Sequence, residues 1–232
     1  MKKLFLSIGV TMVLAATSSA NDINSALNTL EGTVQDNEGN VYRTVQIGDQ
    51  VWMAENLRST KYQDGSKIKT AAIPKDDDSN LLKYGRLYDW HDVADERNLC
   101  PEGWRVATDE DWKELERTIG MSEEDIGKDG WRGDNDIAIQ LKESQPDSLF
   151  KSFDQSQVNK QNFFARPAGV KWKGFYITQG VYTEFWTGTK AKDDKAFIRT
   201  LAYSWWNPHK GEIRRTTSSK DYMFSVRCIK VE

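Results

Sequence analysis

The sequence predicts a single α+β domain with short antiparallel strands, one clear helix and irregular loops. Three observations predict it. Apolar and polar residues alternate from Val41 to Ile47, which is typical of a half-buried strand. A helical pattern with a good N-cap begins at Thr108. The chain after Asn159 is aromatic and punctuated by glycines, and no linker divides the chain beyond residue 31.

The composition is that of a globular protein with mixed surface charge. Of 232 residues, 38% are hydrophobic and 11% aromatic, and 32 positive charges nearly balance 35 negative ones. Without a basic excess, we expect no nucleic-acid partner. Two histidines and two cysteines leave little material for a metal site, and no cofactor is expected.

The first twenty residues have the order of a secretory signal peptide. Lys2 and Lys3 precede an apolar run from Leu4 to Ala16, and small residues follow up to Ala20. We expect cleavage after Ala20, a polar linker over 21–31 and the domain over 32–232. The apolar run is shorter than the roughly 20 residues of a membrane-spanning helix. The protein is therefore expected to be secreted or at the cell surface, with no transmembrane segment after cleavage.

Export changes the interpretation of the two cysteines. Cys100 and Cys228 would lie in an oxidising compartment, and their even count favours one disulfide. Two buried free thiols and a catalytic cysteine are the alternatives. A nucleophilic cysteine needs a basic partner, and nothing around His91 indicates an activated thiol.

The first part of the domain is predicted to be a meander followed by a loop. Thr33 to Gln35, Val41 to Ile47 and Gln50 to Met53 are separated by turn residues, which indicates three antiparallel strands. Residues 61–80 are polar and contain Pro74, so we expect a surface loop.

The clearest helix lies within residues 104–120. Thr108 can cap it, and the acidic residues of its first turn suit the helix dipole. Its apolar residues share one face, and Gly120 suits its C-terminal end. These apolar residues are Trp112, Leu115 and Ile119. Shorter helical turns are expected at 122–125 and 137–142.

The remainder is predicted to be short strands. They are expected at 162–165, 174–176, 184–187, 196–204, 212–216 and 222–230.

Six blocks in one order resemble the Fibrobacter succinogenes major paralogous domain family. They are Val45 to Leu57, Tyr84 to Trp90, Cys100 to Trp112, Phe163 to Gly169, Phe185 to Thr189 and Phe224 to Cys228. The resemblance covers about residues 31–232. Two blocks depart from the family pattern, at Arg166-Pro167-Ala168-Gly169 and at Thr187-Gly188-Thr189, and these changes bear on local loop shape.

The resemblance implies an exported protein with a C-type-lectin-like fold, in the branch that includes the formylglycine-generating enzymes. In that fold a cysteine near the first helix commonly bonds to one in the last strand, which corresponds to Cys100 and Cys228. Since those enzymes use a reactive cysteine pair with copper, cysteines at the structural positions argue against that activity. A triad at His91, between Asp89 and Asp92, needs spatial geometry that a sequence does not supply.

The lectin-type Ca²⁺ motifs are incomplete in this sequence. Sugar-binding C-type lectins place Ca²⁺ with Glu-Pro-Asn or Gln-Pro-Asp and with Trp-Asn-Asp. Gln-Pro-Asp occurs once, at Gln145-Pro146-Asp147, but Trp-Asn-Asp does not occur, and the nearest sequence, Trp206-Asn207-Pro208, lacks the carboxylate. Residues 76–78 and 134–136 offer acidic oxygens without EF-hand spacing, so we interpret both as solvated loops.

The tryptophans divide into two groups. Five lie in the family-like blocks and are expected in the core: Trp52, Trp90, Trp104, Trp112 and Trp186. Four lie outside them and are candidates for ligand contact, or else fill gaps under loops: Trp131, Trp172, Trp205 and Trp206. Alternation along 196–206 would place Trp205 and Trp206 on opposite faces, so at least one should approach solvent.

The predicted ligand site is therefore Trp205 and Trp206 with Asn207 and His209 of the following turn. The expected function is non-catalytic binding at or beyond the cell surface, with a polysaccharide or a surface protein as partner. A structural or adhesive protein with a protein partner is the alternative, and an enzyme of unassigned activity is the third.

Overall fold

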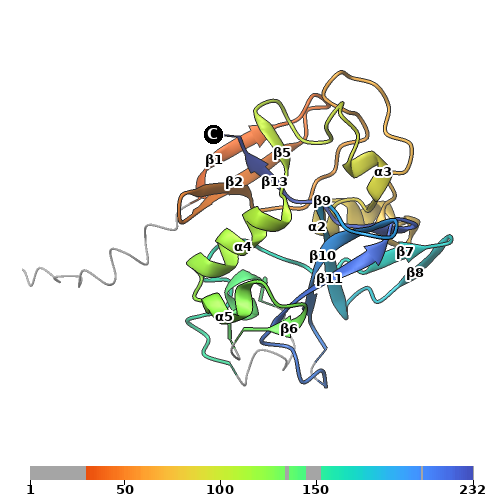
Figure 1. The fold of residues 1–232 in the computed structure, drawn as a ribbon. Coiled ribbons are helices and arrows are strands. Elements are labelled where there is room, and N and C mark those ends of the chain that lie inside the picture. The colour runs from red at the N-terminus through yellow and green to blue at the C-terminus, as the bar shows by residue number, and fades with distance from the viewer. Residues whose placement is uncertain (1–29, 134–135, 145–152, 205, 232) are drawn as a thin grey trace, which may run out of the picture.

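The computed structural model describes residues 30–133, 136–144, 153–204 and 206–231, arranged as three antiparallel sheets with short helices between them (Figure 1). The first sheet has the order β1-β2-β3-β13-β5. Its strands are β1 (Leu30–Gln35), β2 (Val41–Ile47), β3 (Gln50–Met53), β13 (Cys228–Lys230) and β5 (Trp104–Val106). Trp52 lies opposite Val45 on one side and Ile229 on the other, which confirms the predicted meander and adds the last strand to it.

The second sheet has the order β6-β11-β10-β9, and the third has the order β4-β12-β7-β8. The second contains β6 (Gly130–Arg132), β11 (Ile213–Ser219), β10 (Lys195–Ala202) and β9 (Tyr182–Lys190). The third contains β4 (Tyr88–Asp89), β12 (Tyr222–Phe224), β7 (Val170–Trp172) and β8 (Phe175–Ile177).

Helix α4 (Asp109–Thr118) is the longest helix described and has the predicted start. The Thr108 hydroxyl accepts a hydrogen bond from the Asp111 amide, and the Asp111 carboxylate accepts one from the Thr108 amide at 2.6 Å. This capping box satisfies two otherwise unpaired donors. Trp112 and Leu115 are fully buried, as their spacing predicted.

The other helices are short. They are α2 (Leu81–Tyr84), α3 (Trp90–Val93) and α5 (Glu123–Ile126), with 3₁₀ turns at Pro74–Asp76, Asp78–Asn80 and Ala138–Leu141. Helix α5 and the last 3₁₀ turn confirm the helical turns expected at 122–125 and 137–142. Within the described part of the chain, no helix has the length and apolar character needed to cross a membrane.

A buried charge network joins α4 to the second sheet. Arg199, on β10, donates to Asp109 at 2.7 Å and to Glu116 at 2.6 Å. Arg132 binds Glu116 and Arg215 binds Asp109, at 2.9 and 2.8 Å. Burial opposes ionisation of Asp109, but Arg215 and Arg199 outweigh it and lower the pKa of this carboxyl. Because buried charges are tolerated only when paired, the network fixes how α4 sits on the sheet.

Aromatic rings pack against one another in the core, among aliphatic side chains. Trp52, Trp112 and Phe163 meet edge to face, with ring centres 5.2 to 5.7 Å apart. Trp186 packs on Phe224 at 4.5 Å in a second cluster. The five tryptophans predicted for the core are all buried, which confirms that interpretation.

Cys100 and Cys228 form a disulfide, with their Cα atoms 5.9 Å apart. It ties the segment before β5 to β13 within the second aromatic cluster. The predicted pairing is thus confirmed, and the two thiol alternatives are wrong.

Four local predictions are wrong. The single strand expected over 222–230 is divided into β12 and β13, which belong to different sheets. Residues 162–165 form no strand, because Asn162 and Phe164 have φ of 52° and 50°, which an extended strand cannot contain. The strand expected over 196–204 ends at Ala202, so pleat alternation does not extend to Trp206. The loop over 61–80 is not wholly at the surface, since Tyr62 and Ile68 are buried in the core.

Candidate functional site

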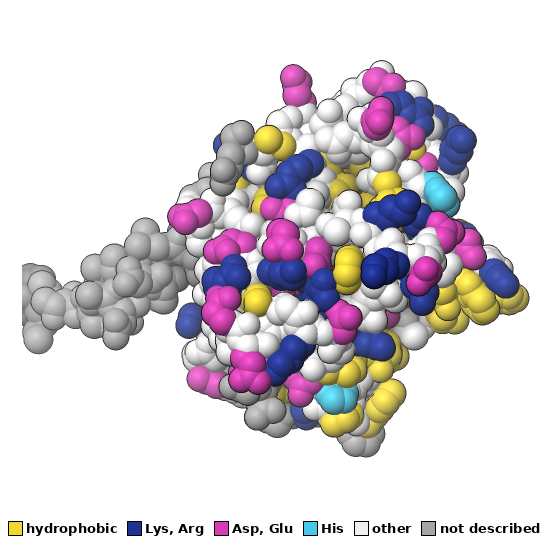
Figure 2. All heavy atoms as spheres, in the orientation of Figure 1, with side chains coloured by type: hydrophobic (Ala, Val, Ile, Leu, Met, Phe, Trp, Pro, Cys, Tyr) yellow, Lys and Arg dark blue, Asp and Glu magenta, His cyan; other side chains and the backbone are white. Residues whose placement is uncertain are grey.

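The predicted ligand residues lie in the loop over residues 203–212, between β10 and β11. Trp205 lies outside the described residues. Trp206 is 60% exposed, Asn207 is buried and His209 is half-buried. Figure 1 shows this loop projecting past β6, and Figure 2 shows a histidine and hydrophobic side chains gathered at that end of the molecule.

Asn207 holds the loop in shape. Its Oδ1 accepts from the His209 amide at 2.8 Å, and its Nδ2 donates to the Tyr182 hydroxyl at 2.9 Å. Its own amide donates to the Ser204 carbonyl at 3.0 Å. Both the oxygen and the nitrogen of the Asn207 side chain therefore hold the turn in place. The exposed Trp206 indole belongs to the residue directly before Asn207 on this anchored turn.

Lys142 anchors the loop through its buried ammonium group. This fully buried side chain donates from Nζ to the Ala202 carbonyl at 2.6 Å and to the Lys210 carbonyl. One ammonium group thereby joins the two ends of the segment that carries Trp206. Burial, assisted by the charge of Lys210, lowers the pKa of Lys142 to about 7.

His209, within the loop, stacks on an aromatic ring of the neighbouring strand β6. The His209 ring lies parallel to the Trp131 indole, at 5.1 Å between centres and 4° between planes. The Arg214 guanidinium lies 5.9 Å from the Trp131 ring centre, and Glu212 Oε2 is 2.7 Å from His209 Nδ1. These four residues, with Trp206 and Asn207, are called the Trp206 surface below.

The Trp206 surface combines an exposed indole with amide, imidazole, carboxylate and guanidinium groups. Aromatic faces bind the apolar face of a sugar or a protein side chain, and the polar groups can hydrogen-bond its edge. The sequence indicated Trp131, Trp206, Asn207 and His209. It did not indicate Arg214, whose place beside Trp131 depends on the pairing of β6 with β11, or Glu212, whose contact with His209 depends on the shape of the loop.

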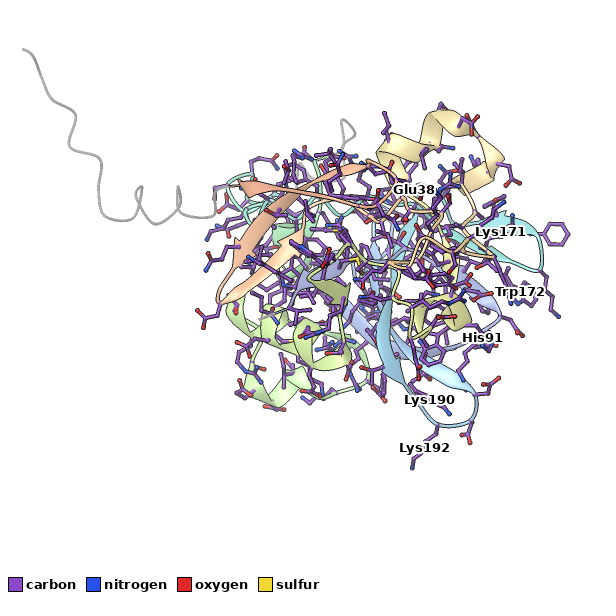
Figure 3. The ribbon with its side chains drawn as sticks, turned by 90° about the horizontal axis from the view of Figure 1, so that it is seen from above. Glu38, His91, Lys171, Trp172, Lys190 and Lys192 are labelled. Carbon is purple, nitrogen blue, oxygen red and sulfur yellow. A yellow bond between two sulfur atoms is a disulfide. The ribbon has the colours of Figure 1, made fainter. Side chains whose placement is uncertain are left out.

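A second apolar surface lies on the hairpin of β7 and β8. Trp172 stacks on Tyr222 at 5.5 Å and 11° and faces Phe175 across the hairpin. Phe175 is 71% exposed, and Ile177 is 42% exposed on the same strand face. We call these four residues the hairpin surface. Figure 3 shows Trp172 and Lys171 at one side of the molecule.

A polar cavity of about 530 Å³ adjoins the disulfide. It is lined by three separate segments, including Asp36, Tyr62 and Cys100. The Asp36 carboxylate already accepts from the Tyr42 hydroxyl and from two backbone amides, so its hydrogen-bonding capacity serves the β1–β2 turn. The sequence did not indicate this cavity, since its walls come together only in the fold.

The aspartates beside His91 have other partners. Asp89 caps α3 by accepting from the Asp92 amide at 3.0 Å, and Asp92 accepts from Tyr62 and Thr70. The triad considered from sequence is therefore not assembled at His91.

Two aspartates of the acidic loop over 76–78 already accept hydrogen bonds from the protein. Asp76 hydrogen-bonds the Tyr176 hydroxyl, and Asp77 accepts from the Ser79 amide at 2.9 Å. Asp134, Asn135 and the segment Gln145-Pro146-Asp147 lie outside the described residues. Across the described ranges, no group of three or more His, Cys, Asp or Glu side chains could hold a metal ion.

Comparison with known proteins gives one positive finding. A family model described as the Fibrobacter succinogenes major domain matches residues 45–230. No curated protein and no solved structure matches the chain.

Proposed function

The chain belongs to the Fibrobacter succinogenes major domain family, and from that premise we propose that it is an exported, non-catalytic binding module. It acts at or beyond the cell surface, and its ligand is a polysaccharide that contacts the Trp206 surface. The export part of the proposal is supported by the signal-like order of residues 1–20.

The exposed indole of Trp206 is the observation that carries this function. Large aromatic side chains are usually buried to a large extent, yet Trp206 is 60% exposed beside the buried Asn207. Since the neighbouring backbone is anchored by Asn207 and Lys142, little conformational entropy is lost when a ligand stacks on the ring.

A pull-down with insoluble polysaccharides tests the proposal, with Trp206→Ala and Phe175→Ala compared. Both remove an exposed ring, so both variants should keep the melting temperature of the wild type. We expect Trp206→Ala to weaken polysaccharide binding at least tenfold and Phe175→Ala to leave it unchanged. Equal binding by wild type and Trp206→Ala would contradict the proposal. A glycan array with Ca²⁺ and with chelator would identify the sugar.

A structural or adhesive role is the second candidate, and the hairpin surface favours it. Phe175 and Ile177 expose apolar area on the edge strand β8, where a protein partner could dock. In that case Phe175→Ala would abolish capture of a surface protein or of a second copy, while Trp206→Ala would not.

For the fold, we propose a C-type-lectin-like arrangement. Two features support it: a bridge from Cys100 to the last strand β13, and a sheet in which β13 lies between β3 and β5.

A further inference from the structure

Glu184, on β9, has a carboxyl oxygen that is buried without a hydrogen-bond partner. This oxygen is Oε2, and the residue as a whole is half-buried. An unpaired buried carboxyl costs free energy, because it loses water and gains nothing in return. A residue kept at such a cost needs a reason outside the stability of the fold.

Glu184 lies in register with the Trp206 surface. Across the second sheet, Glu184 is opposite Thr200, Thr200 is opposite Arg214, and Arg214 is opposite Trp131. Residues directly opposite in paired strands point to the same face of a sheet. One row of side chains therefore runs from Trp131 across all four strands to Glu184.

The row also meets the loop. Tyr182, two residues before Glu184 and on the same strand face, accepts the hydrogen bond from Asn207. A hydrogen bond thus joins Asn207 of the Trp206 surface to the strand face that carries Glu184.

Other buried oxygens without partners occur just before β9 and just after β10. They include Thr178 Oγ1, Gln179 Oε1 and Ser204 Oγ. The Tyr203 amide donates to the Val181 carbonyl at 2.7 Å, which brings the stretch 178–184 beside Ser204. Most buried polar groups in proteins are paired, so such a concentration indicates a place where hydrogen bonds are made to something else.

We propose that Glu184 is a ligand-binding residue that pairs with adjacent hydroxyl groups of a neutral sugar unit, extending the Trp206 surface across the sheet. This rests on the proposed function and names its ligand class. Arg214 supplies the nearest opposing charge and disfavours a cationic ligand at Glu184. Burial raises the pKa of Glu184 to about 8. At neutral pH the group is therefore mostly a neutral acid, which both donates and accepts, as a sugar hydroxyl does.

Two substitutions at this position test the proposal. Glu184→Gln keeps one donor and one acceptor, and Glu184→Met removes both at similar length. The probes are a neutral β-glucan, a xylan and a mannan, with polygalacturonate and chitosan as charged comparisons. We expect a neutral polysaccharide to bind, Glu184→Gln to bind within threefold of wild type, and Glu184→Met to bind at least tenfold more weakly. Glu96→Met, at an exposed position, is the matched control and should bind as wild type.

The melting temperature separates a binding role from a structural one. Because Glu184 has no partner to lose, Glu184→Met should melt at or above the wild-type temperature. A marked fall in melting temperature together with weaker binding would make Glu184 a structural residue and overturn the proposal.

The remaining outcomes are also decisive. Undiminished binding by Glu184→Met while Trp206→Ala fails to bind overturns the role of Glu184 and leaves the proposed function standing. Loss of binding by Glu184→Gln, or binding to charged polysaccharides alone, overturns the neutral-sugar assignment. If the wild-type domain binds none of the probes, both proposals fall.

Discussion

Replacing Lys142 with methionine should change how the stability of the protein depends on pH. Lys142 is fully buried, and burial lowers its pKa from the ordinary value of 10.5 to about 7. In the unfolded chain the same group takes up its proton at the ordinary value. Between these two pH values the unfolded state binds more protons than the folded state, so the free energy of unfolding rises with pH.

The size of the effect follows from the two pKa values. Below pH 7 both states carry the proton and the cost of burying the charge is felt in full. Since each tenfold change in proton affinity is worth about 1.4 kcal/mol, the whole difference amounts to about 5 kcal/mol. About 2 kcal/mol of it should be regained between pH 7 and pH 9. Methionine has similar length and no proton to exchange, so it lacks this gain.

Urea unfolding at pH 6, 7, 8 and 9 measures the effect. The quantity to follow is the free energy of unfolding of wild type minus that of Lys142→Met, because other titrating groups cancel in this difference. It should be flat below pH 7 and then rise by about 2 kcal/mol up to pH 9. The exposed variant Lys160→Met controls for the loss of one positive charge. Parallel curves for wild type and Lys142→Met over the whole range would show that the ammonium group is not buried as described.

Three further predictions concern the fold and export. Cys228→Ser should lower the melting temperature, since the bridge spans 128 positions and such a loop is worth about 5 kcal/mol in the chain-entropy account; non-reducing peptide maps that lack the linked pair would contradict this. Glu116→Gln should cost about 3–5 kcal/mol in denaturant unfolding, because it leaves Arg132 and Arg199 buried with weakened partners; a loss below about 1 kcal/mol would show that the network matters little. Exported protein should begin at Asn21 on N-terminal sequencing, and an intact Met1 on exported material would refute cleavage.

Features that depend on local sequence were predictable. The meander over 33–53 is marked by alternation and turn residues, and its register needs only short turns. The start of α4 is set by Thr108 and Asp111, three positions apart. The disulfide could be predicted because the sequence contains only two cysteines and an oxidising compartment was expected.

Features that depend on distant pairing were not predictable. Strands β4, β6 and β7 contain two or three residues, too few for a period to show, and they form because β12 and β11 lie beside them. Along β10, Arg199 is the only charged residue between Ala196 and Ala202, and a charged side chain usually indicates solvent exposure. It is fully buried because α4 brings Asp109 and Glu116 over that face.

The candidate site divides in the same way. Trp206, Asn207 and His209 were found because an aromatic pair beside a turn is visible in the sequence. Glu184 and Lys142 were not predicted from the sequence. Glu184 stands out because its Oε2 atom has no hydrogen-bond partner, and Lys142 because it donates to the carbonyls of Ala202 and Lys210, and only the fold shows either feature.

The position of β13 has a mechanical consequence. The first and last described strands belong to one sheet, so tension between residues 30 and 231 pulls directly on the pairing of β13 with β3 and β5. With the disulfide intact, residues 100–228 are bypassed and carry no load. At roughly 3.4 Å per residue, an oxidised domain can extend by only about 25 nm, against about 70 nm after reduction. A protein held at one end to a surface and at the other to a load would therefore keep the second sheet, and the Trp206 surface on it, folded under force.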